Sequence, residues 1–131
     1  MKKVLSVICV ILSAPTYAQK ITTDDVMKKV STGKPYTFVM LKTGKALPGD
    51  KDTVQKMQME HLVNLFQMEQ DGKISIFGPI SNNEVFRGII IFNSADTNYV
   101  KQELNADPYV QAGYMAYDLY PWFSIPGQKL P

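Results

Sequence analysis

The segment FRGIIIFN, residues 86–93, is the strongest indication of how this chain folds, because Gly88 to Phe92 includes no polar side chain. β-Branched and aromatic residues favour β-strands, and a strand that is apolar at every position needs cover on both faces. Residues 36–41, with the sequence YTFVML, form a second run of the same kind. These two segments are therefore expected to be the central strands of one sheet.

The longest helix is expected between these two strands, at residues 53–70. At 100° per residue, its apolar side chains and one histidine share a single stripe that would face the sheet. The members of this stripe are Val54, Met57, His61, Leu65 and Met68. Asp52 is the expected N-cap, and Asp71-Gly72 is expected to end the helix.

Two further strands and one helix complete the pattern. A strand at residues 74–78 is followed by turn-forming residues, so it is expected to pair with residues 86–93 as an antiparallel hairpin. Ser94 is expected to cap a second helix that runs to about Ala106, where the Asp107-Pro108 pair ends it. Residues 114–120, YMAYDLY, are expected to form the last strand.

The resulting order of strand, helix, strand, strand, helix, strand is that of a ferredoxin-like α+β domain, βαββαβ. An extra N-terminal helix is expected at residues 22–31, and residues 121–131 are interrupted by proline and glycine. In such a domain both helices cover the same face of the sheet. Because the central strands are apolar on the other face too, we expect a homodimer that packs sheet against sheet. Residues 19–32, folded over that face, are the alternative cover.

The first 18 residues have the features of a secretory signal peptide. Two lysines precede an apolar segment, residues 4–12, that is too short to span a bilayer as a stable helix. Thr16 and Ala18 are small residues at the positions that a signal peptidase reads, so cleavage is expected after Ala18. The protein is therefore expected to be exported, either to the periplasm or out of the cell. A buried N-terminal helix is the alternative.

The composition of residues 19–131 excludes several classes of function. Two of the 14 basic residues lie in the signal peptide, which leaves 12 against 12 acidic residues. A formal charge near zero provides no basic surface for nucleic acid and no polybasic patch for a membrane. The only cysteine, Cys9, is lost with the signal peptide, so the mature chain has no disulfide, no thiolate and too few ligands for a Cys/His zinc site. No metal or other cofactor is expected.

His61, the only histidine, lies on the apolar stripe of the long helix and therefore faces the interior. A buried imidazole needs a hydrogen-bond partner, because one unsatisfied group costs roughly 1–3 kcal/mol. On the simpler interpretation, His61 belongs to the core and a backbone carbonyl satisfies it. On the other, it lines a cleft at the edge of the sheet and acts as a general acid or base, which suits a side-chain type that titrates near neutrality.

Asp107 also allows two interpretations. It can cap a single helical turn at residues 108–112, with Pro108 in the first helical position and Gly113 at the exit. It can also accept a hydrogen bond from a nitrogen of His61, which would fix the tautomer of the imidazole and raise its basicity. The two roles are compatible because a carboxylate has two oxygens.

Several short motifs resemble those of the YCII-related family, in the order that the family has. They are His61-Leu62, Asp71-Gly72, Phe77-Gly78-Pro79-Ile80, Arg87-Gly88, the run DPYVQAG at residues 107–113, and Tyr120-Pro121-Trp122. The resemblance covers residues 36–123. We therefore divide the chain into a signal peptide (1–18), a helical extension (19–35), a YCII-like domain (36–123) and a C-terminal tail (124–131).

The resemblance implies a dimeric α+β barrel built from ferredoxin-like halves. It also implies that His61 and Asp107 correspond to a histidine–aspartate pair, which lies in a cleft and is the proposed active site of the family. It does not specify a reaction, because proteins of this fold include lactone isomerases, dehydrochlorinases and haem proteins, and fold alone is a poor guide to function.

Four other residues are candidates for the walls of the cleft. Arg87, the only arginine, either forms a surface salt bridge or holds an anionic group of a substrate in its planar fork. Tyr109 is the aromatic residue expected beside Asp107, and Gly78 and Pro79 shape the end of the second strand.

The sequence therefore favours proton transfer on a small organic molecule, of the isomerase or lyase type, by His61 oriented by Asp107. Such a reaction needs neither a nucleophilic side chain nor a metal. One alternative is a module that binds a small apolar ligand without reaction, and haem with His61 as its axial ligand is one version of it. The other is a dimer in which the histidine is purely structural.

Overall fold

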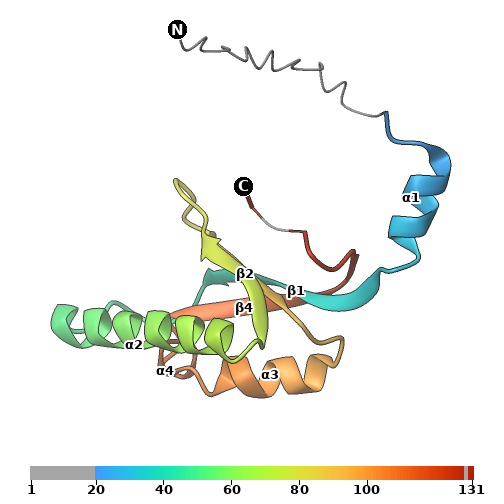
Figure 1. Ribbon diagram of the computed structural model, residues 1–131. Coiled ribbons are helices and arrows are strands. Elements are labelled where there is room, and N and C mark those ends of the chain that lie inside the picture. The colour runs from blue at the N-terminus through green and yellow to red at the C-terminus, as the bar shows by residue number, and fades with distance from the viewer. Residues whose placement is uncertain (1–19, 129) are drawn as a thin grey trace, which may run out of the picture.

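A computed structural model describes residues 20–128, 130 and 131, and shows a four-stranded antiparallel sheet with helices packed against one face (Figure 1). The elements are α1 (Thr23–Val30), β1 (Lys34–Thr43), α2 (Lys51–Gln70), β2 (Ile74–Pro79), β3 (Phe86–Phe92), α3 (Thr97–Asn105), α4 (Pro108–Gln111) and β4 (Met115–Ser124). The strand order β2-β3-β1-β4 makes β3 and β1 central. The ferredoxin-like α+β fold expected from the sequence is confirmed. The expected signal peptide lies outside the described residues.

The core lies between the central strands and the helices. Val39 of β1, Ile90 and Phe92 of β3, and Val100 of α3 are completely buried. Of the expected stripe on α2, His61, Leu65 and Met68 are buried, whereas Val54 and Met57 are half-buried. The C-terminal half of α2 is therefore the part that the sheet covers, and His61 lies at the boundary.

Several element boundaries differ from the sequence-based expectation, and three of the differences have a clear physical reason. Asp50, not Asp52, caps α2, because its carboxylate accepts hydrogen bonds from the backbone N–H and the hydroxyl of Thr53 at 3.0 and 2.8 Å. Asp96, rather than Ser94, caps α3 by accepting from the next helical N–H groups. β4 continues through Pro121 because it is an edge strand, where a missing N–H removes no necessary bond.

A β-bulge interrupts the pairing of the two central strands at Arg87. Leu41 of β1 pairs with Gly88 of β3, but the next residue, Lys42, pairs with Phe86. Arg87 is therefore the extra residue on β3. A bulge of this kind changes the direction in which a side chain points, and it lies at the end of the sheet where β2 also ends.

The face of the sheet opposite the helices is apolar and only partly covered. Tyr36 contacts Trp122, and Phe38 contacts Tyr120, with ring centroids 5.9 and 6.1 Å apart. Residues 124–128 and 130 fold back near Tyr36 at one end of this face, and Figure 1 shows this tail on the side away from α2 and α3. Tyr120 nevertheless remains 50% exposed.

The N-terminal helix does not cover this face. α1 lies away from the sheet in Figure 1, and none of its residues is buried. The alternative cover expected for residues 19–32 is therefore absent from the part of this segment that the structure describes. Between residues 20 and 128, no helix combines the length and the apolar character that crossing a membrane requires.

Candidate functional site

His61 projects from α2 toward the sheet and is 6% exposed. Its ring lies 6.0 Å from that of Tyr109, centroid to centroid, with a 37° angle between the planes. Its Nδ1 atom lies 2.8 Å from Oδ2 of Asp107, which is 46 residues later in the chain. The pairing that the sequence suggested is therefore present.

The carboxylate of Asp107 has a protein donor on both oxygens. Oδ2 accepts from His61 Nδ1 and, at 3.1 Å, from the side-chain amide of Asn64. Oδ1 accepts from the backbone N–H groups of Tyr109 at 2.9 Å and Val110 at 3.4 Å. The same side chain thus caps α4 and binds the imidazole, as the two oxygens of a carboxylate permit.

These contacts determine the charge of Asp107. Burial alone would raise the pKa of this carboxyl group, but the hydrogen bonds from His61 and Asn64 outweigh it, and the pKa lies below the ordinary 3.8. Asp107 is therefore ionised at neutral pH and can only accept hydrogen bonds. Nδ1 of His61 must then carry the proton, which leaves the lone pair of a neutral imidazole on Nε2.

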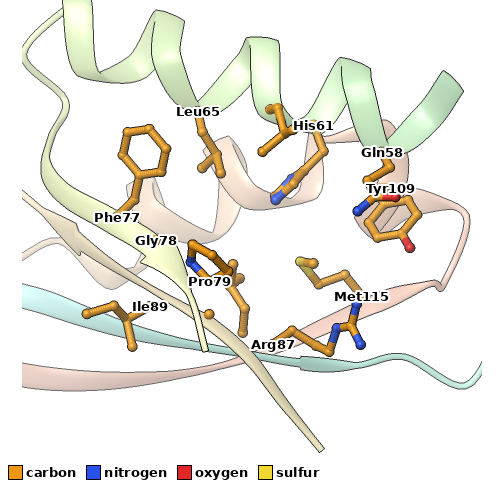
Figure 2. A pocket seen from close by; sticks show the side chains of 13 residues that line it. Gln58, His61, Leu65, Phe77, Gly78, Pro79, Arg87, Ile89, Tyr109 and Met115 are labelled. Carbon is orange, nitrogen blue, oxygen red and sulfur yellow. The ribbon is translucent and has the colours of Figure 1, made fainter. Parts of the chain in front are cut away.

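Nε2 of His61 opens into a cavity of about 280 Å³ between α2 and the bulged end of the sheet (Figure 2). Every buried side-chain nitrogen or oxygen of the described residues has a hydrogen-bond partner, and Nε2 forms none with them, so this atom is accessible from the cavity. The walls are mainly apolar. They include Leu41, Leu62, Leu65, Phe77 and Met115.

The other candidate residues also lie at this cavity. Gly78, Pro79, Arg87 and Tyr109 line it together with His61. Asp107 does not line it, because the imidazole stands between its carboxylate and the cavity. One side of the His61 imidazole thus faces an apolar cavity, and the other side donates a hydrogen bond to the carboxylate of Asp107.

Two polar residues of the site were not predicted from the sequence. Asn64 donates to Asp107, and Gln58 lines the cavity beside His61. They lie three residues after and three before His61, and residues at this spacing share one face of a helix. The helical spacing around the only histidine could therefore have identified both.

No group of three or more His, Cys, Asp or Glu side chains that could hold a metal ion occurs within residues 20–128. The polar side chains that line the cavity are His61, whose imidazole can exchange a proton, and Gln58, Tyr109 and Arg87, which can form hydrogen bonds.

Two solved structures are similar to this chain, and the one with the higher TM-score supports the fold. The structure of muconolactone isomerase is similar, with a TM-score of 0.57, 10% identity, and coverage of 73% of this chain and 96% of that one. A second structure is 5-chloro-2-hydroxyhydroquinone dehydrochlorinase (TftG) from Burkholderia phenoliruptrix AC1100, in complex with 2,5-dihydroxybenzoquinone. Its TM-score is 0.46, its identity 19%, and its coverage 66% of this chain and 92% of that one. No curated protein sequence matches the chain.

At the level of sequence families, the model of the YCII-related domain matches residues 36–123. The matched segment begins in β1 and ends in β4, and it contains both His61 and Asp107. The chain belongs to the YCII-related family.

Proposed function

We propose that this protein is an acid–base catalyst of the isomerase or lyase type, in which His61 transfers a proton to or from a small organic molecule. One observation carries the proposal. Nε2 of the imidazole faces an apolar cavity of about 280 Å³, while Nδ1 lies 2.8 Å from the carboxylate of Asp107. This is the arrangement in which a histidine is a good base, because the carboxylate stabilises the imidazolium that forms when Nε2 takes a proton.

The residues of the cavity are suited to either type of reaction. In an isomerisation, Nε2 removes a proton from a carbon next to a carbonyl group and returns it to another carbon of the resulting enolate. In an elimination, it removes the proton while a neighbouring substituent leaves with its bonding electrons. The isomerisation places negative charge on the enolate and the elimination places it on the leaving group, and the donors of Gln58 and Arg87 can stabilise either.

Hydrogen–deuterium exchange on small carbon acids tests this function. Unsaturated γ-lactones and cyclic enols are suitable probes, incubated in heavy water with the wild type and with His61→Gln. Glutamine can still donate to Asp107 but is not a base, so exchange is expected to fall by about 10²–10⁴-fold, the usual contribution of a general base. Equal rates in the two proteins would reject catalysis and leave a binding module or a structural dimer, the alternatives from the sequence.

We also propose that the active form is a homodimer that covers the open face of the sheet. Tyr120 and Trp122 on this face are 50% and 39% exposed, and Phe86 is 40% exposed. Aromatic residues grouped on one surface are typical of a protein interface. A second copy supplies an identical surface, so the contact would be a two-fold one.

Export is a further part of the proposal, supported by the amino-acid pattern of residues 1–18. Mass spectrometry of the protein from its native cells is the direct test. A chain that begins at Gln19 is expected, and one that keeps residues 1–18 would contradict cleavage after Ala18.

A further inference from the structure

Among the residues that the structure describes, Arg87 is a cation without an anionic partner. The ion pairs between described side chains, apart from the one at His61, join Lys42 to Asp118, Lys56 to Glu60 and Lys73 to Glu103. Arg87 forms no salt bridge and no side-chain hydrogen bond within the part of the chain that the structure describes. The surface salt bridge, one of the two interpretations of this residue from the sequence, is therefore not formed there.

The bulge on β3 explains why Arg87 reaches the cavity. Side chains alternate between the two faces of a regular strand, and Gly88 pairs with Leu41, whose side chain lines the cavity on the helix-covered face. In a regular strand Arg87 would therefore point to the opposite face. As the extra residue of the bulge it lies at the cavity instead, and Figure 2 shows its guanidinium on the sheet side, across from the helix that carries His61.

The cavity contains no carboxylate that could neutralise this guanidinium. None of its lining residues is aspartate or glutamate. Asp107 lies behind the imidazole and has protein donors on both oxygens. The wall opposite His61 therefore has one positive charge, on an exposed side chain at the rim of a mainly apolar cavity.

We propose that the ligand of this cavity is a small planar organic anion, such as a carboxylate on a single unsaturated ring, and that Arg87 binds its charged group. Arginine presents a planar fork of donors that matches a carboxylate. The ring would lie against the apolar wall formed by Leu65, Phe77 and Met115. At about 280 Å³ the cavity lies just below the roughly 300–1,000 Å³ found for pockets that hold drug-sized ligands, which suits one ring.

This inference names the substrate class and so rests on the proposed function for its link to catalysis, but the binding of an anion can be tested separately. Benzoate and benzamide are suitable probes because they are nearly equal in shape and differ in charge. His61 is the only histidine, so its side-chain NMR signal reports occupancy of the cavity without ambiguity. We expect benzoate to bind the wild type about tenfold more tightly than benzamide, a difference of 1.4 kcal/mol.

The variant Arg87→Gln is expected to remove this preference, so that benzoate binds no more tightly than benzamide, while the affinity for benzamide stays within about twofold. Lys101→Gln is the matched control, because it makes the same change of charge on α3, outside the cavity. Arg87→Lys keeps the charge without the fork and should retain part of the preference. Far-ultraviolet circular dichroism establishes that each variant is folded.

Equal affinity of the wild type for the two probes, or no binding of benzoate, would overturn the inference. An equal loss in Lys101→Gln would overturn it too, because it would assign the effect to the overall charge. Failure of the proposed function gives a different result. If His61→Gln leaves exchange unchanged while the Arg87-dependent preference remains, the cavity binds anions without catalysis. If exchange depends on His61 and the preference is absent, the substrate is neutral.

Discussion

The hydrogen bond from His61 to Asp107 determines which nitrogen of the imidazole can act as a base. With an ionised carboxylate at Nδ1, the lone pair of the neutral ring is on Nε2, which faces the cavity. Asp107 has a second partner on Oδ2, Asn64, and its other oxygen is occupied by the amides of α4. Several donors therefore hold the carboxylate in place when the imidazole gains or loses a proton.

The variant Asp107→Asn should reverse the tautomer. Asparagine is a good N-cap, so its side-chain oxygen can still accept from the N–H of Tyr109. Its NH₂ group then faces both Nδ1 of His61 and Asn64, whose amide must turn to present its oxygen, and it donates to both, which moves the imidazole proton to Nε2. Exchange activity is expected to fall by about 10²–10⁴-fold with little change of fold. Nitrogen-15 NMR of the side chain distinguishes the tautomers, and a proton still on Nδ1 in the variant would contradict the assignment.

Asp107 should also make stability depend on pH in acid. The pKa of its carboxyl group is lower in the folded protein than the ordinary 3.8, so the unfolded chain binds more protons in this range. Its contribution is fully present above the unfolded pKa and is lost as the pH falls through the lower folded pKa. We expect the free energy of unfolding in urea to fall below about pH 4, and to fall less steeply in Asp107→Asn. Parallel curves would assign the acid sensitivity to other carboxylates.

At the scale of elements, the close packing of β2 against β3 forms the floor of the cavity. A Cβ atom added at Gly88 would lie 2.7 Å from the carbonyl oxygen of Gly78, closer than real Cβ atoms approach. The strands would have to separate, so Gly88→Ala should lower stability by about 1–3 kcal/mol, the usual cost of overpacking. Gly78→Ala is the control, because its Cβ meets no atom within 4 Å. Thermal unfolding of both variants measures the difference, and equal melting temperatures would contradict it.

The sequence predicted the elements better than their ends. β1 and β3 were recognisable because a central strand needs apolar side chains on both faces, and α2 because its stripe repeats at helical spacing. The caps were placed on Asp52 and Ser94, since several neighbouring residues can each cap a helix and only the backbone geometry selects Asp50 and Asp96. The last strand was predicted to end too early, at Tyr120 before Pro121, because the sequence does not show that this strand lies at an edge.

The candidate site was predictable from the sequence only in part. His61 and Asp107 were recognised as partners through short motifs and the topology, although they are 46 residues apart. The position of Arg87 was left open between two roles. A bulge depends on how two strands pair, and that pairing is set by contacts far apart in the chain, so local sequence does not reveal it.

At the scale of the whole molecule, the uncovered face of the sheet predicts the assembly. Tyr120 lies on this face, packs on Phe38 and is 50% exposed, so Tyr120→Lys should cost an isolated chain little. In a two-fold dimer the variant would bring two ammonium groups into the interface. Light scattering after size-exclusion chromatography should show a dimer for the wild type and a monomer for the variant.

The matched control for the assembly is Val63→Lys, on the outer side of α2, where the side chain is 63% exposed. This variant is expected to remain dimeric. A monomeric wild type would refute the assembly, and dissociation of the control would show that the sheet face is not the contact.

If the protein is the catalyst proposed above, the four-residue helix α4 has a consequence for the time course of its activity. A single turn has little stability of its own, and the amides at its start are bound to the same carboxylate that orients His61. When this turn frays, Oδ1 of Asp107 loses its donors, and only the contacts at Oδ2 with His61 and Asn64 still hold the carboxylate against the imidazole. The protein would then alternate between competent and incompetent forms without unfolding elsewhere. The rate at which the amides of Tyr109 and Val110 exchange with solvent would thus measure the fraction of time during which Asp107 is fully bound and His61 is correctly oriented.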